Sequence, residues 1–155
     1  MPWWQTSQID GGYNCVAWAL HFSKDTFWPE PYHYWPLTYP AVVDVKAFAD
    51  GFACYGFQPC NGSQLERGFE KIALYTRNGE PMHVARQRPD GTWTSKLGPK
   101  IDIGHHGLHE FPPELHVAAL YGSATHFFRR SHARARIDFI GRVIWIAQRR
   151  IMQKF

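Results

Sequence analysis

The sequence predicts a single α+β domain in which a short N-terminal helix, carrying a cysteine, packs on a small antiparallel sheet. Three observations predict this class. The chain has 155 residues, the size of one ordinary domain. Apolar residues recur at three- and four-residue spacing after residue 14, as on one face of a helix. Three segments between residues 70 and 97 favour strands and are separated by turn signals.

The N-terminal third is predicted to hold two helices joined by an irregular segment. Residues 15–22, CVAWALHF, form the first helix, with Asn14 as its N-cap. Residues 26–40 hold four of the eleven prolines among aromatic residues, so we expect a rigid loop that borders a cleft. Pro40 occupies the first position of the second helix, which ends at Gly56.

The middle of the chain is predicted to form strands. Residues 70–77, 82–88 and 92–97 are separated by NGEP and PDG, which are strong turn signals. The expected product is an antiparallel three-stranded meander. Further along, the pattern predicts a loop bearing glycine and histidine, a short helix and one last strand, at residues 98–107, 112–122 and 124–130 respectively.

Composition excludes several classes of protein. Hydrophobic residues make up 45% of the chain and aromatic residues 16%, so intrinsic disorder is not expected. The sequence has neither the ~18 continuous apolar residues of a membrane span nor a secretory signal. We therefore expect a cytoplasmic protein, with signal-independent export left open. Three cysteines without a C-x-x-C pair argue against a disulfide framework and a structural zinc site.

Basic residues gather at the C-terminus. Residues 129–155 carry eight Lys or Arg and one acidic residue, whereas the rest of the chain is net negative. Isoleucines recur at helical spacing there, so residues 131–155 are predicted as a basic amphipathic helix that extends the domain of residues 1–130. Three roles stay open for it: capping the fold and engaging a protein partner, lying on an anionic membrane surface, or contacting nucleic-acid phosphates, which no motif supports.

Cys15 is the first candidate for a catalytic residue. A thiol attacks as thiolate, and the N-terminus of a helix is expected to lower the pKa of Cys15. Gly11 and Gly12 would let the backbone approach a substrate closely, and the Cys15 N–H can donate to a developing oxyanion. The alternative is that Cys15 is a small buried apolar residue, the commoner fate of a free cysteine.

A nucleophilic thiol needs a base, and His83 is the candidate. His83 opens a predicted strand in PMHVARQ, where we expect it to project toward the helix that packs on the sheet, with Val84 on the opposite face. Ser95 lies on the next strand of the hairpin, so its hydroxyl is expected near the His83 imidazole. Asp102 and His105 are substitutes for Ser95 if the following loop folds back over His83.

Four stretches carry a resemblance to a known family: GGYNCVAWAL, GFEKIALY, HVARQ and DGTWTSKLG. Their order resembles the NlpC-like and CHAP-like branch of the papain-fold cysteine hydrolases, in which a helix carrying the thiol packs on an antiparallel sheet whose first histidine is the base. The set also looks like a group of small bacterial proteins of unassigned function with that fold, over residues 8–128. The resemblance implies Cys15, His83 and Ser95 as the triad, with serine where His, Asn or Gln is usual.

The expected activity is hydrolysis of a peptide, isopeptide or cell-wall amide bond. The candidate residues beyond the triad are Tyr13 and Asn14 beside the oxyanion, and Trp28 and Trp35 as a wall for the substrate. A non-catalytic binding module on the same fold and an antibacterial effector toxin remain as alternatives. No cofactor or metal is expected, because no cysteine or paired carboxylate at ligand spacing accompanies the histidines His105, His106, His109 and His116.

Overall fold

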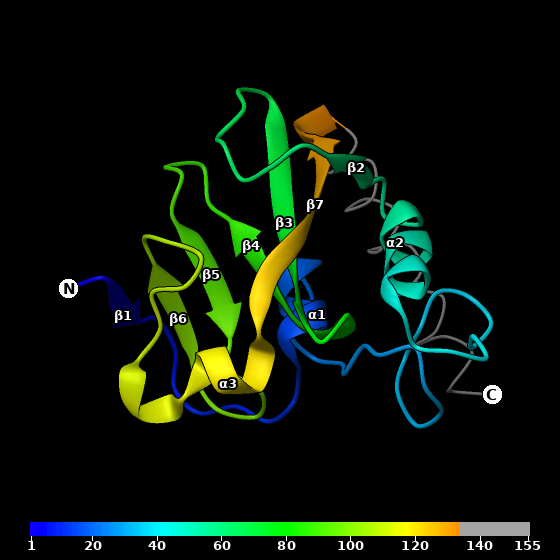
Figure 1. Cartoon of the computed structure of the whole chain (residues 1–155), viewed down its shortest axis with the longest axis horizontal. Coiled ribbons are helices and arrows are strands. Elements are labelled where there is room, and N and C mark those ends of the chain that lie inside the picture. The colour runs from blue at the N-terminus through cyan, green and yellow to red at the C-terminus, as the bar shows by residue number, and fades with distance from the viewer. Residues whose placement is uncertain (134–155) are drawn as a thin grey trace, which may run out of the picture.

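The computed structural model describes residues 1–133. The predicted basic helix of residues 131–155 falls almost wholly on residues 134–155, outside the described part. Within residues 1–133 the α+β class is confirmed: a seven-stranded antiparallel sheet is accompanied by three short α-helices (Figure 1). No helix in this part is both long and apolar enough to cross a bilayer.

The predicted meander is confirmed at the centre of the sheet. The sheet order is β1-β6-β5-β4-β3-β7-β2. The bounds are β1 Trp3–Gln5, β2 Gln58–Cys60, β3 Phe69–Arg77, β4 Glu80–Gln87, β5 Trp93–Lys96, β6 Asp102–His105 and β7 Ser123–Ser131. The predicted last strand is therefore not at the sheet's edge, because β7 lies between β3 and β2.

Three strands, β1, β2 and β6, are not predicted from the sequence. Strand β6 lies within the expected loop of residues 98–107, and β1 and β2 have three residues each. Segments this short show no clear alternation of polar and apolar residues, and β1 and β2 pair with strands that are distant in the sequence. Only their pairing with β5, β6 and β7 makes them strands.

The bounds of the helices differ from those predicted, and local backbone conformation and capping explain the differences at α1 and α2. Helix α1, Cys15–Ala19, stops before His21, which has a φ of +65°. Helix α2, Val45–Ala53, begins five residues after Pro40, because the Asp44 side chain accepts a hydrogen bond from the Ala47 N–H at 2.8 Å. The predicted helix 112–122 is divided into a 3₁₀ turn, Pro113–Leu115, and helix α3, Val117–Tyr121.

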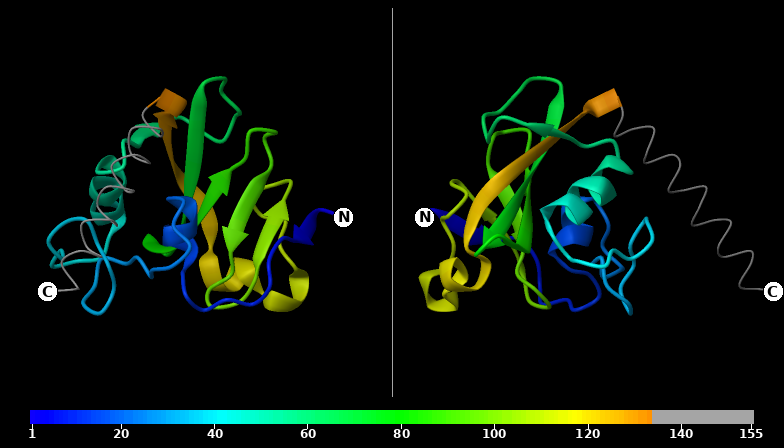
Figure 2. Two further views of the ribbon diagram at one scale, coloured as in Figure 1. Left: turned by 180° about the vertical axis from the view of Figure 1, so that it is seen from behind. Right: turned by 45° about the vertical axis from the view of Figure 1, so that its right-hand side comes forward.

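The two faces of the sheet are covered by different elements. Helices α1 and α3 lie on opposite sides, as the front view and the view from behind show (Figures 1 and 2). The larger buried cluster joins α1, α2 and the aromatic residue Phe27 to β3, β4 and β7. The smaller cluster lies on the other face, where Tyr75 and Trp93 pack against Phe111 and Tyr121. Strand β4 thus contributes side chains to both clusters.

Candidate active site

Cys15 is the first residue of α1 and is held there by its neighbour. The Asn14 side chain accepts a hydrogen bond from the Ala17 N–H at 3.0 Å, which fixes the start of the helix. Helix α1 packs on β4 and β5. Cys15 is 7% exposed and belongs to the larger buried cluster, together with Val84 of β4. The helix therefore points the thiol at the sheet rather than at solvent.

The structure corrects the expected pKa of this thiol. Burial raises the pKa of Cys15 to about 11, although the backbone N–H groups of Val84, Val16 and Cys15 itself, and the charge of Lys96, act to lower it. Desolvation outweighs these favourable groups because a thiolate loses its hydration when it is buried. The thiol is consequently protonated at neutral pH, and it would be nucleophilic only after a base removed its proton.

The sulfur meets β4 where the sheet is locally incomplete. Strands β4 and β5 are paired only at Arg86↔Thr94 and Gln87↔Trp93, so the pairing ends before Val84. The Val84 backbone N–H at this point of β4 acts to lower the pKa of the Cys15 thiol. Val84 is the neighbour of His83 in the sequence, so α1 packs on the part of β4 that carries His83.

The predicted proximity of His83 and Ser95 is confirmed. His83 Nε2 lies 3.0 Å from Ser95 Oγ, and Ser95 Oγ lies 2.9 Å from His105 Nε2. His105 Nδ1 in turn lies 2.8 Å from the carbonyl oxygen of Gly107. All three side chains of this relay, His83, Ser95 and His105, are completely buried. His105 thus extends the chain of hydrogen bonds beyond Ser95 rather than replacing it.

Both imidazoles of the relay are neutral at physiological pH. Burial, together with the nearby His105, lowers the pKa of His83 to about 3. Burial lowers the pKa of His105 to about 4, and its hydrogen bond to the Gly107 carbonyl only partly offsets this. His83 Nδ1 is buried and has no hydrogen-bond partner within residues 1–133. The lone pair of the unused ring nitrogen can accept a proton, but burial makes this imidazole a weak base.

Cys15 and His83 approach β4 from opposite faces, which corrects the expectation that His83 points toward the helix carrying the thiol. Val84 packs with α1, whereas the His83 ring stacks on Tyr121 of α3 with the centroids 4.2 Å apart. Burial raises the pKa of Tyr121, and a negative charge on Cys15 raises it further. No hydrogen bond joins the thiol to the imidazole in the described part of the chain.

The two residues expected beside the oxyanion have structural partners. The Tyr13 hydroxyl donates a hydrogen bond to Asp102 Oδ2 at 2.6 Å. The Asn14 side chain, besides capping α1, accepts from the Phe27 N–H at 3.1 Å and donates to the Phe27 carbonyl at 2.8 Å. Asn14 therefore ties the start of α1 to the proline-rich segment. Asp102 is engaged by Tyr13, so it is not the residue that orients His83.

The tryptophans expected to wall a substrate pack on α2 instead. Trp28 is half-buried, and its ring meets Phe48 edge-on with centroids 5.0 Å apart. Trp35 is 7% exposed and also packs on Phe48, at 5.4 Å. A side chain at Gly51 would clash with the Trp35 ring, which shows how closely this ring lies on the helix. Trp35 is accordingly a core residue.

Lys96 is a component of the site that the sequence analysis missed. The Lys96 side chain is completely buried, donates hydrogen bonds to the carbonyls of Asp10 and Lys100, and lies 4.8 Å from the centroid of the Tyr13 ring. Its charge favours the thiolate form of Cys15. Alternation along a strand places Lys96 on the face opposite Ser95, but no sequence signal indicates that its ammonium group is buried.

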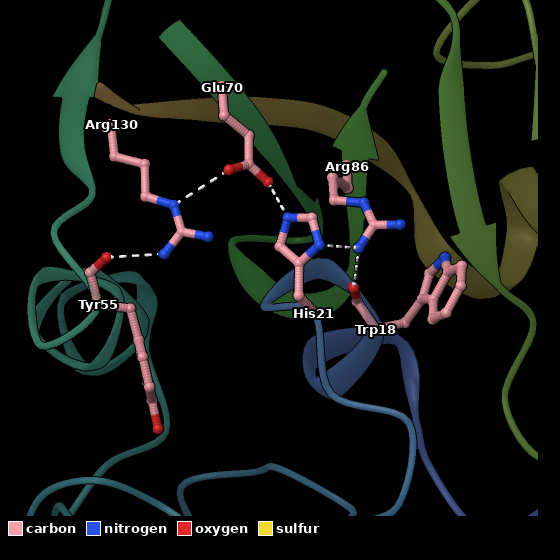
Figure 3. A network of polar contacts seen from close by, with 6 residues as sticks. All are labelled: Trp18, His21, Tyr55, Glu70, Arg86 and Arg130. Carbon is pink, nitrogen blue, oxygen red and sulfur yellow. Dashed lines mark hydrogen bonds and ion pairs between the residues drawn. The ribbon is translucent and has the colours of Figure 1, made fainter. Parts of the chain in front are cut away.

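A polar network holds α1 against the sheet (Figure 3). Arg86 Nη1 donates to the Trp18 carbonyl and to His21 Nδ1, both at 2.9 Å. His21 Nε2 contacts Glu70, whose other carboxylate oxygen accepts from Arg130 Nε at 3.1 Å. Despite burial, His21 and Arg130 lower the pKa of Glu70 to about 2. The network links α1 to β3, β4 and β7, and so it fixes the position from which Cys15 reaches β4.

The loop histidines are separated by the fold. His105 is committed to Ser95 and Gly107, His106 packs beside Trp4, and His109 accepts from the Ala124 N–H. Within residues 1–133 no group of three His, Cys, Asp or Glu side chains is arranged to hold a metal ion.

Comparison with known proteins gives one finding. The model of a family described as "Domain of unknown function (DUF7689)" matches residues 4–129, which include the thiol, the relay and every strand except β1 and β7 in full. No curated protein and no solved structure shows a significant match.

Proposed function

The chain belongs to this DUF7689 family, and we propose that it is a papain-like cysteine hydrolase that cleaves an amide bond with Cys15 and His83. Peptides, isopeptides and cell-wall peptide cross-links share the bond that this chemistry attacks. Ser95 is the residue that orients the imidazole. The basic C-terminal segment is proposed to engage a protein partner, and we propose a cytoplasmic location.

The reaction follows from the protonation states in the site. His83 Nδ1 takes the proton of the Cys15 thiol, and the sulfur forms a bond to the carbonyl carbon of the substrate. The C–N bond then breaks, and His83 returns the proton to the leaving amine. Water, deprotonated by His83, attacks the acyl-thioester, which releases the acid and restores the thiol.

One observation carries this proposal: one ring nitrogen of His83 is held by Ser95, and the other is buried and has no partner within residues 1–133. His83 is also the neighbour of Val84, whose N–H acts to lower the pKa of the Cys15 thiol. A buried polar atom without a partner is costly, and a catalytic role is one of the reasons for which such an atom is retained. Proton transfer requires Cys15 Sγ and His83 Nδ1 to come within hydrogen-bonding distance at this end of β4.

Substrate binding requires the aromatic cover of the site to move. The Tyr121 ring lies flat on His83, and Phe111 also faces it at 6.1 Å between centroids. Helix α3 has five residues and follows a left-handed residue, His116. A helix this short has little stability of its own, so its displacement costs less than opening the sheet would.

Alkylation of the thiols tests the proposal. The full chain is treated with iodoacetamide at pH 7, and mass spectrometry of its peptides gives separate rates for Cys15 and for the exposed Cys54. We expect His83→Gln to slow the labelling of Cys15 by about a hundredfold, the lower end of what a positioned base contributes. The rate at Cys54 serves as the internal control. Equal Cys15 rates in wild type and His83→Gln would refute the proposal.

A binding module without turnover is the second candidate, and the burial of both groups favours it. Cys15 is 7% exposed and His83 is completely buried, whereas a hydrolase must admit its substrate to both. In this case Cys15 is a core residue and the fold presents its surface to a partner. Iodoacetamide labelling that is slow at Cys15 and insensitive to His83→Gln is the result expected of this module.

An antibacterial effector toxin would use the same hydrolase chemistry on the cell wall. Growth arrest on expression in the periplasm, abolished by Cys15→Ala, is the result expected of it.

A further inference from the structure

We propose that His105 is a positioning residue that fixes the tautomer of His83 through the hydroxyl of Ser95. Its catalytic meaning rests on the proposed function, but the tautomer is a property of the folded protein that can be measured without turnover. The relay consists of four groups in sequence: the Gly107 carbonyl, His105, Ser95 and His83.

The direction of each hydrogen bond follows from the fixed end of the relay. The Gly107 carbonyl can only accept, so His105 Nδ1 must carry the proton that it donates over 2.8 Å. In a neutral imidazole the other nitrogen, His105 Nε2, then carries a lone pair and accepts from the Ser95 hydroxyl at 2.9 Å. The Ser95 oxygen, whose only proton is used in this way, accepts from His83 Nε2 at 3.0 Å.

The consequence falls on the far nitrogen of His83. With its proton on Nε2, a neutral His83 keeps a lone pair on Nδ1, the buried atom that has no partner in the described part of the chain. Only this tautomer can accept a proton at Nδ1. A backbone carbonyl that lies twelve residues beyond Ser95 in the sequence thus determines whether His83 is a base on that side.

The reverse direction is unfavourable. If Ser95 donated to His83 Nε2, then His105 Nε2 would have to donate to Ser95, and the lone pair of His105 Nδ1 would face the Gly107 carbonyl. Two acceptors facing each other in a buried site leave both without a hydrogen bond. A doubly protonated His105 would satisfy both bonds but would bury a charge beside Phe111, whose ring centroid lies 4.8 Å away.

Nuclear magnetic resonance of ¹⁵N-labelled full-length protein tests the proposal, because the two neutral tautomers of histidine give different ¹⁵N shift patterns. In wild type we expect the proton of His83 on Nε2 and the proton of His105 on Nδ1. His105→Phe keeps a ring against Phe111 but removes the acceptor for Ser95. Ser95 is then free to donate to His83 Nε2, so we expect the tautomer of His83 with its proton on Nδ1 to gain population relative to wild type.

His105→Gln is the matched control, because its side-chain oxygen can accept from Ser95 and should preserve the wild-type tautomer of His83. We expect iodoacetamide labelling of Cys15 to fall about tenfold or more in His105→Phe and to recover in His105→Gln. If His105→Phe does not fold, the wild-type spectrum decides alone. A wild-type His83 with its proton on Nδ1, or a tautomer unchanged in folded His105→Phe, would overturn the proposal.

The test separates this proposal from the proposed function. If the expected tautomers are found but Cys15 labelling is the same in wild type and His83→Gln, the proposed role of His105 holds and the proposed hydrolase activity is refuted.

Discussion

Acidification from pH 7 to pH 5 should destabilise this protein through two buried histidines, His83 and His105. The pKa of each is close to 6.5 in the unfolded chain and is lowered by burial to about 3 and about 4 in the folded protein. The unfolded state therefore binds protons first. The stability contributed by the two neutral imidazoles is complete above pH 6.5 and is lost as the pH falls from there toward the folded-state pKa values.

The magnitude follows from proton linkage. At pH 5 each unfolded imidazole is protonated and each folded one is still neutral, so each costs about 2 kcal/mol relative to pH 7. Together they remove about 4 kcal/mol, a large part of the 5–15 kcal/mol that is typical of a domain. Glu70 adds nothing in this window, because its pKa is lowered from 4.5 to about 2 and its effect begins only below its usual pKa.

Urea unfolding at pH 7 and pH 5, followed by tryptophan fluorescence, measures the loss. We expect the loss to be about halved in His105→Gln, which removes one of the two buried imidazoles. The matched control is His132→Gln, because His132 is exposed and its replacement should leave the loss unchanged. A wild type that loses less than about 1 kcal/mol, or an undiminished loss in His105→Gln, would refute the burial of neutral imidazoles.

Three further predictions use the same protein. Tyr121→Ala should uncover His83 and speed iodoacetamide labelling of Cys15 severalfold, whereas Tyr121→Phe keeps the ring and the wild-type rate; equal rates in both would contradict the aromatic cover. Gly122→Ala should lower the free energy of unfolding in urea by about 3 kcal/mol, because Gly122 has a φ of +71° and the added Cβ would lie 2.0 Å from a backbone oxygen. Gly68→Ala, where the Cβ would meet no neighbouring atom, should lower it by only about 1 kcal/mol. Arg130→Met should lower the free energy of unfolding by about 3 kcal/mol, because it leaves Glu70 buried with one partner fewer. The double variant with Glu70→Gln should recover part of this loss, and losses that simply add would contradict an interaction between the two residues.

Turn residues close together in the sequence were sufficient to predict the strands at the centre of the sheet. Asn78 and Gly79, with φ of +51° and +80°, form the tight turn between β3 and β4 that the sequence NGEP predicts. Gly91, with φ of +88°, lies in the turn between β4 and β5. Because a hairpin places its two strands side by side, the sequence also predicted that His83 and Ser95 meet.

The role of His105 depended on β6, a strand that the sequence did not predict. The sequence left Ser95, Asp102 and His105 as alternatives, because residues 98–107 carry no clear strand pattern. Pairing of β6 with β5 directs alternate residues to opposite faces, so His105 reaches Ser95 and Asp102 reaches Tyr13. The register of a strand is set by the strand it pairs with, so it cannot be read from the residues of one segment alone.

The sequence by itself determined the α+β class, the start of α1 at Cys15 and the His83–Ser95 pair, because caps and turns act between residues close together in the chain. Only the tertiary structure decided which face of β4 each group occupies and how deeply it is buried. The pKa of Cys15 illustrates the difference: position at a helix start predicts a lowered value, and burial against β4 raises it to about 11. Desolvation depends on everything packed around a group, which residue order alone does not specify.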